Sequence, residues 1–212
     1  MDAEVFRAWI VSAAGVIEAN RDHLTQLDAA IGDADHGINL SRGFTAVLGA
    51  LDAAEAKAAT PGAILTLTGN TLISKVGGAS GPLYGTAFRR AGKALGGAAD
   101  VDLAALSAAL DAALAGVQQL GAAREGDKTM VDALAPATRA FSKAITAGAS
   151  PDDALSVLVE AATAGAAATV PMQALKGRAS YLGPRSVGHE DPGAVSTALI
   201  LGALAGAAQA GR

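Results

Sequence analysis

The chain contains no cysteine, and only 3% of its residues are aromatic. The absence of cysteine excludes disulfide bonds, zinc–thiolate sites and thiol nucleophiles. Basic residues are not in excess, because 16 Lys and Arg stand against 20 Asp and Glu and give a net charge of −4. Without a basic patch, we expect no nucleic-acid partner. The acidic first residues lack a signal-peptide pattern, so a cytoplasmic location is expected.

The composition and periodicity of the chain favour helices. Hydrophobic residues make up 51% of the chain, and Ala, Gly and Leu dominate while β-branched runs are few. This mixture favours closely packed helices over sheets. Apolar residues recur at helical spacing, and the alternation typical of strands is missing from the sequence. The predicted fold class is all-α, with residues 1–212 forming a single domain that is an eight-helix up-and-down antiparallel barrel or bundle.

Capping patterns give the expected helix boundaries. The first helix is expected from about residue 3 to beyond residue 20, and the second begins near Gly37. A capping residue followed by proline marks three further starts, at Thr60-Pro61, Ser150-Pro151 and Asp191-Pro192. The remaining starts are expected at Ser80, at Asp102, and at Asp127 or Thr129.

One apolar stretch, residues 194–210, resembles a membrane span in composition. It is shorter than the roughly 20 residues that a span needs. The preceding Asp191-Pro192 pair is how helices of soluble proteins begin. We therefore expect a buried helix and no membrane partner.

Three aspartates lie close together in residues 27–40: Asp28, Asp33 and Asp35. Carboxylates brought this close repel one another unless a cation lies among them. Gly32 and Gly37 flank the last two, so the backbone can turn sharply there. Oxygen ligands without cysteine select a hard cation, Mg²⁺ or Ca²⁺. The cluster predicts a site for one or two Mg²⁺ ions shared with a nucleotide.

Two alternatives to a magnesium site follow from the same residues. The aspartates could merely cap turns and helix starts. A calcium loop of the EF-hand type is disfavoured because the glutamate at its twelfth position is missing. Phe44 is twelfth from Asp33, and Asn39 is twelfth from Asp28.

The polar, glycine-rich loops are expected at one end of the barrel. Alternate loops of an up-and-down bundle meet at the same end. These loops are residues 28–37, 76–82, 121–129 and 176–191, and the segment 170–190 is expected to be irregular. The sequence therefore predicts that the chemistry lies at this rim.

Several rim residues suit an anionic ligand. Glycines in residues 77–81, with Ser80 at a helix start, can cradle a phosphate, although the same residues also make an ordinary turn. Arg178 can clamp a phosphate or form a surface ion pair. Met130 can pack against a flat base. His36 remains open as a general base, a phosphate donor or a polar neighbour.

Five motifs together resemble the nucleotide-binding L subunits of dihydroxyacetone kinases, and the likeness covers essentially the whole chain in order. They are residues 32–37 (GDADHG), 77–83 (GGASGPL), 126–130 (GDKTM), 177–183 (GRASYLG) and 188–193 (GHEDPG).

This resemblance implies a barrel of eight helices with the nucleotide at one end. Asp28, Asp33 and Asp35 would ligate two Mg²⁺ ions that bridge the phosphates of ADP or ATP, and Arg178 would neutralise phosphoryl oxygens as the catalytic residue. The nucleotide would be bordered by His36, Gly37, Ile38, Asn39, Ala79, Ser80, Gly121, Met130, Arg178, Asp191, Pro192 and Gly193.

The resemblance also implies partners. A separate K subunit would hold dihydroxyacetone, and a phosphohistidine M subunit would rephosphorylate ADP in place, as in the phosphotransferase-system type that the DADH sequence resembles. Three alternatives stay open: a non-catalytic nucleotide-binding module that docks on a transcription regulator, an L subunit for another small sugar, and a plain bundle with a metal-stabilised loop. The sequence leaves the oligomeric state open, a homodimer included.

Overall fold

The computed structural model describes residues 1–54 and 59–211, and in these ranges it contains nine α-helices, one 3₁₀-helix and no strand. The elements are α1 (Ala3–Ala19), α2 (Arg21–Ile31), α3 (His36–Ala53), α4 (Pro61–Lys75), α5 (Ser80–Leu95), α6 (Leu103–Gly121), α7 (Val131–Thr146), α8 (Pro151–Ala168), the 3₁₀-helix η1 (Arg178–Ser186) and α9 (Pro192–Ala210).

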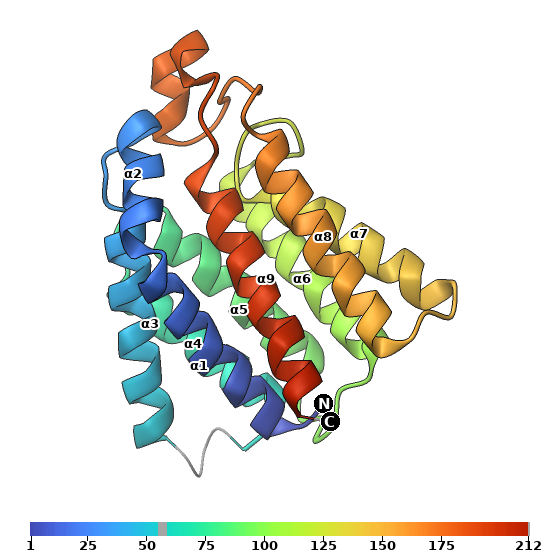
Figure 1. Ribbon diagram of the computed structural model, residues 1–212. Helices are drawn as coiled ribbons and strands as arrows, with labels where there is room; N and C mark the ends of the chain where they lie inside the picture. Colours follow the sequence, from blue (N-terminus) through green and yellow to red (C-terminus); the bar gives the residue numbers. More distant parts are fainter. Residues whose placement is uncertain (55–58, 212) are drawn as a thin grey trace.

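Eight of these helices form a closed barrel. From α3 to α9 each helix packs against the next along the chain, α3 also packs against α1, and α9 packs back against α1 to close the ring (Figure 1). Helix α2 continues beyond α1, packs mainly against α3, and lies with η1 at the end opposite the two chain termini. The predicted all-α, eight-helix barrel is confirmed, with α2 as an additional helix.

The first predicted helix is wrong in one respect, because it is interrupted at Asn20. The backbone leaves helical geometry there, and the Asn20 side chain donates to the Val16 carbonyl at 2.8 Å. Asparagine competes in this way with the helical hydrogen bonds of its own backbone. Asp28 consequently lies near the end of the separate helix α2 and is buried, whereas the sequence placed it in a loop.

Four predicted N-caps are confirmed, since each side chain accepts a hydrogen bond from a backbone N–H three residues on. They are Thr60, Asp102, Ser150 and Asp191. Of the two caps predicted for α7, Thr129 is supported, because its side chain accepts from the Val131 N–H at 3.2 Å, although Met130 is the residue directly before the helix. Asp132 accepts from the Thr129 N–H at 2.8 Å in return, which makes a capping box. The segment 170–190, expected to be irregular, includes η1.

The barrel core holds six of the seven aromatic residues and most of α9. Trp9 lies between Phe6 and Phe88 and donates its indole N–H to the Ile200 carbonyl at 2.9 Å. In the described ranges, α6 and α9 are long and apolar enough to cross a membrane by length and composition alone. In α9, however, 56% of the most apolar window is buried inside the barrel, as expected of a core helix.

Helices α4 and α5 pack unusually closely because glycines face each other at two levels. A Cβ on Gly69 would lie 2.5 Å from the Gly85 carbonyl oxygen, and a Cβ on Gly85 would lie 2.7 Å from the Gly69 oxygen. One barrel level away, Gly62 and Gly92 stand in the same relation. These glycines therefore set the separation of α4 and α5 and, with it, the position of the N-terminus of α5.

We predict opposite effects for alanine at two helical glycines. Gly69→Ala should destabilise the fold by about 1–3 kcal/mol, because the new methyl group overlaps backbone atoms of α5 that cannot move cheaply. Gly49→Ala, whose Cβ would meet nothing within 4 Å, should stabilise it by about 0.5–1 kcal/mol through helix propensity. Urea unfolding followed by circular dichroism measures both values. Equal effects of the two substitutions would show that α4 and α5 are not held at glycine-limited distance.

Candidate functional site

A cleft at the end of the barrel away from the termini gathers residues from all the predicted rim loops. Helices α3, α5, α7 and α9 all begin at this end (Figure 1). The lining residues include Asp28, Asp33, Asp35, His36, Gly78, Ala79, Ser80, Tyr84, Lys128, Met130, Lys176, Arg178, Asp191, Pro192 and Gly193. Helix N-termini carry unpaired N–H groups and partial positive charge, so their convergence favours an anionic ligand. The predicted meeting of the loops is confirmed.

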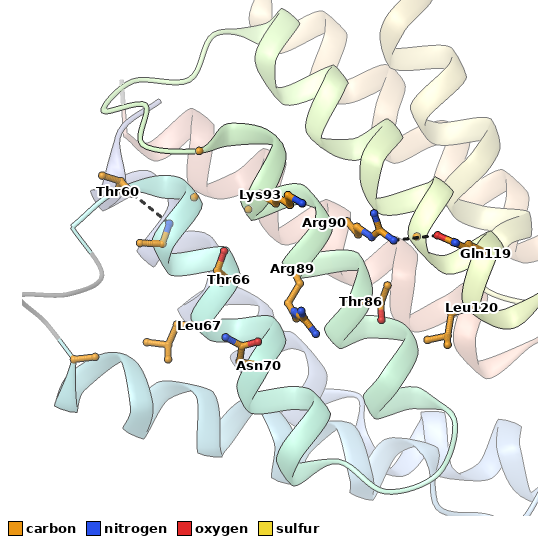
Figure 2. Close-up of a pocket in the computed structure, with 16 residues that line it drawn as sticks. Thr60, Thr66, Leu67, Asn70, Thr86, Arg89, Arg90, Lys93, Gln119 and Leu120 are labelled. Atoms are coloured by element: carbon orange, nitrogen blue, oxygen red, sulfur yellow. Dashed lines mark hydrogen bonds between the residues drawn. The ribbon is translucent and has the colours of Figure 1, made fainter.

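A larger hollow lies elsewhere, on the outer face of α4, α5 and α6. It has a volume of about 1110 Å³, and Figure 2 shows Arg89, Arg90 and Lys93 along its α5 wall. Arg90 donates to the Gln119 side chain at 3.0 Å. Among the residues that the structure describes, the hollow shares no lining residue with the rim cleft, and its lining contains no carboxylate. The chemistry predicted from the sequence therefore belongs to the smaller cleft.

The three aspartates converge as predicted. One carboxylate oxygen from each of Asp28, Asp33 and Asp35 lies within 4.8 Å of the others. Asp28 is buried, and its Oδ2 accepts from the N–H groups of Asp35 at 2.8 Å and His36 at 3.2 Å. These two bonds fix the loop on the end of α2 and hold the carboxylates together.

Gly32 leaves room for the remaining oxygen of Asp28. A Cβ at this position would lie 2.0 Å from Asp28 Oδ1, so any other residue would displace that oxygen. Ala34, between the other two aspartates, has φ 60°, a turn conformation uncommon outside glycine. The site thus consists of three clustered carboxylates with a glycine-made space beside the buried one. This all-oxygen set fits Mg²⁺, which takes few carboxylates and completes its shell with water and phosphate oxygens.

Arg178 lies at this cluster. Its Nε is 2.9 Å from Asp33 Oδ2, and both side chains are partly exposed to the cleft. Arg178 therefore forms the ion pair that was the alternative to a phosphate contact, and its partner, Asp33, is one of the candidate metal ligands. A ligand that draws Asp33 onto a cation would free the guanidinium for phosphate oxygens, which it can bind through two N–H groups.

His36 lies in the cleft wall, where it is largely buried between two hydroxyl groups. Its Nδ1 lies 3.0 Å from Ser80 Oγ, and its Nε2 lies 2.8 Å from Ser196 Oγ. Burial lowers the pKa of His36 to about 4, and the nearby Asp28 charge opposes this only in part. The side chain is therefore a neutral imidazole at pH 7 and carries one N–H.

Sequence reasoning missed Lys128 as an important residue of the rim. Its side chain is almost fully buried, and its ammonium group donates to the Thr169 carbonyl at 2.6 Å and to the His189 carbonyl. It thereby ties the end of α8 to the start of α9. The residue has φ 60°, and no local pattern in the sequence announces a buried lysine. Sequence reasoning also missed Ser196, which bonds His36, and Tyr84, which bonds Ser196, because no local pattern marks either residue.

Four predicted nucleotide contacts lie outside the cleft lining: Gly37, Ile38, Asn39 and Gly121. Gly37 has a packing role, since a Cβ there would lie 2.0 Å from the Arg21 carbonyl oxygen. Asn39 accepts from Arg42 at 2.8 Å, and Ile38 is half exposed. Their contact with a nucleotide stays a prediction.

Comparisons with known proteins identify the family to which the chain is similar. The DAK2 domain family matches residues 30–206. The chain is 42% identical, over 95% of both chains, to the Escherichia coli protein named PEP-dependent dihydroxyacetone kinase, ADP-binding subunit DhaL. It is 38% identical to the Lactococcus lactis protein named PTS-dependent dihydroxyacetone kinase, ADP-binding subunit DhaL, over 92% of this chain and 93% of that one.

A solved structure shows the same fold. The dihydroxyacetone kinase from C. freundii in complex with AMP-PNP and Mg²⁺ superposes with a TM-score of 0.66 at 31% identity. The match covers 94% of this chain and 33% of that one, so the chain spans about a third of that kinase.

The buried Asp191 predicts a pH-dependent stability. Burial raises the pKa of Asp191 to about 7, with Asp132 and Asp28 adding to the rise and the Ala194 N–H and Lys128 opposing it. An unfolded aspartate titrates near 3.9. Between these values the folded chain binds more protons than the unfolded chain, so this group's contribution to stability falls as the pH rises towards 7 and is constant above it.

Asp191→Asn removes this titration and keeps the N-cap acceptor. In metal-free, ligand-free protein, the unfolding free energy of the wild type relative to Asp191→Asn should fall between pH 4 and 7, by roughly 4 kcal/mol at most. Urea unfolding at each pH measures the difference, which also cancels the opposite titration of His36. A difference that does not vary over this range contradicts the prediction.

Proposed function

Because the chain belongs to the DAK2 domain family, we propose that it is the ADP-binding subunit of a phosphoenolpyruvate-dependent dihydroxyacetone kinase, a phosphotransferase. The observation that carries the proposal is the three-carboxylate cluster of Asp28, Asp33 and Asp35, which opens into a cleft bordered by four helix N-termini. The names of the E. coli and L. lactis relatives, each matched over nearly its whole length, support it. Since phosphoenolpyruvate is a cytoplasmic metabolite, we also infer a cytoplasmic location.

The cleft residues divide the work of phosphoryl transfer. Asp28, Asp33 and Asp35 would hold two Mg²⁺ ions, which supply positive charge to the phosphate oxygens when bound. Arg178, which is paired with Asp33 in this structure, would neutralise the charge that develops on the transferring phosphoryl group. Ala79 and Ser80, at the N-terminus of α5, would face the phosphates, and Met130 would border the base; all three line the cleft.

The acceptor and the phosphoryl donor are assigned to other chains. A K-type subunit brings dihydroxyacetone to the mouth of the cleft, and a phosphohistidine M-type subunit rephosphorylates the bound ADP, which acts as a coenzyme. Neither role needs a nucleophile here, and the chain has no cysteine to serve as one. The isolated protein should therefore not phosphorylate dihydroxyacetone.

We predict that the cluster governs both nucleotide retention and transfer. Native mass spectrometry of the purified protein should show bound ADP, and the Asp33→Ala/Asp35→Ala double variant should show none while its circular dichroism spectrum is unchanged. Asp22→Ala, which removes an exposed aspartate of α2 outside the cleft, is the control and should retain ADP. Retention of ADP by the double variant would contradict the site.

Adding the K-type and M-type subunits with phosphoenolpyruvate and its relay proteins then tests catalysis. Phosphorylation of dihydroxyacetone by the wild type, and none by the double variant, supports the proposal. ADP binding without transfer to any small ketose would instead favour a regulatory nucleotide-binding module. Phosphoryl transfer only to another ketose would change the proposed acceptor but leave the role of the chain as a nucleotide-binding kinase subunit.

We propose that the K-type subunit docks on η1 and the residues that flank it in the chain. Tyr181 on η1 is 89% exposed, and the apolar residues Leu175 before η1 and Val187 after it are also exposed. An aromatic residue buried at the centre of an interface typically contributes about 2 kcal/mol, a factor of ~30 in affinity. Tyr181→Ser should weaken binding of the K-type subunit by roughly this factor and leave ADP retention unchanged.

Val11→Ser is the matched control, because Val11 is a half-exposed apolar residue on α1 outside the rim. Calorimetry with the K-type subunit should not distinguish it from the wild type. Equal weakening by both substitutions would contradict docking at η1.

A further inference from the structure

A continuous chain of hydrogen bonds runs from the barrel interior to the cleft. It passes from Tyr84 OH to Ser196 Oγ at 2.7 Å, from Ser196 Oγ to His36 Nε2 at 2.8 Å, and from His36 Nδ1 to Ser80 Oγ at 3.0 Å. The four side chains come from α5, α9, α3 and α5 again. Ser80 ends the chain at the cleft wall.

The direction of donation along this chain is not fixed by its geometry. A neutral imidazole has one N–H, and each hydroxyl has one proton. In the inward arrangement, Ser80 donates to His36 Nδ1 and His36 Nε2–H donates to Ser196. Ser196 then donates to the Pro192 carbonyl at 2.9 Å, and Tyr84 donates to the Gly193 carbonyl at 2.9 Å.

In the outward arrangement the direction of donation is reversed at each hydrogen bond of the chain. Tyr84 donates to Ser196, Ser196 donates to His36 Nε2, and His36 Nδ1–H donates to Ser80. The Gly193 carbonyl stays satisfied, because Thr197 Oγ1 donates to it at 2.8 Å. Hydrogen bonds aligned head to tail in this way strengthen one another.

The two arrangements present different groups to the cleft. In the inward arrangement the Ser80 hydroxyl donates its proton to His36, so that Ser80 Oγ can offer a ligand only its lone pairs. The outward one leaves that proton free to be donated. Because the ligand of the proposed function is a phosphate, whose oxygens only accept, only the outward arrangement offers it a hydrogen bond.

We propose that Tyr84 and Ser196 are positioning residues that hold His36 as its Nδ1–H tautomer when the nucleotide is bound, and so turn the Ser80 hydroxyl proton onto a phosphate oxygen. This inference rests on the proposed function and deepens it. Ser196 is not among the residues that line the cleft, and Tyr84, which is, acts on the phosphate through Ser196, His36 and Ser80.

A double-mutant cycle with Mg–ADP as the probe tests the coupling. Ser196→Ala should weaken Mg–ADP binding about fivefold to tenfold, the usual scale for a buried hydrogen bond, and Tyr84→Phe should weaken it less. In a Ser80→Ala background, Ser196→Ala should have no further effect, because the group on which it acts is gone. Thr68→Val is the control and should leave the affinity unchanged, because it removes a buried hydroxyl that has no hydrogen-bond partner among the described residues.

The tautomer gives an independent readout that a merely structural role would not move. Long-range ¹H–¹⁵N correlation spectra of the wild type should show the His36 proton on Nδ1 in the Mg–ADP complex. Tyr84→Phe should restore a measurable population of the Nε2–H form, and Thr68→Val should not.

Two results overturn the inference: an Nε2–H tautomer in the wild-type complex, or additive effects of Ser80→Ala and Ser196→Ala. If Ser196→Ala does not fold, Tyr84→Phe replaces it in the cycle. Failure of the wild type to bind Mg–ADP would overturn the proposed function instead, so the two failures are distinguishable.

Discussion

Three carboxylates within 4.8 Å of one another repel strongly, and a folded chain keeps them together only where positive charge lies nearby. In this protein that charge comes from Arg178 and from the N-termini of α3, α5, α7 and α9. The same arrangement that makes the carboxylates tolerable also attracts an anion. Bound metal ions and phosphates would therefore complete a compensation of charge that the fold itself provides only in part.

The barrel topology delivers this arrangement, and glycines give it its dimensions. An up-and-down ring brings every second helix start to the same rim, whatever the side chains. The depth of the cleft depends on close approach, where Gly32 gives space to a carboxylate oxygen and Gly37 lets α3 approach α2. Gly69 and Gly85 do the same for α4 and α5. The glycine content of the chain is thus part of the site as well as of the packing.

The sequence predicted the parts that depend on local spacing. The aspartate cluster, the helical class and four N-caps each follow from residues close together in the chain. The break at Asn20 could not be read from periodicity, because the helices on both sides of it keep apolar faces. The bond between Tyr84 and Ser196 joins residues 112 positions apart, and each is ordinary within its own helix. The two hydroxyl groups come within hydrogen-bond distance only because α5 and α9 pack into the same barrel.

The buried polar groups of the rim complete the argument about specificity. A barrel built mainly of alanine, glycine and leucine can slide or repack at little cost, because such side chains fit many registers. Lys128 and His36 can be buried only where the Thr169 carbonyl after α8 and the Ser80 hydroxyl of α5 stand in one relation to them. The Asp191 N–H at the start of α9 likewise donates to Thr169 Oγ1. Since an unpaired buried polar group is costly, these contacts disfavour any slipped packing at the end where four helices must start together. Hydrogen bonds of buried polar groups thus hold the rim in one geometry, and hydrogen bonds are also what the rim offers to a ligand.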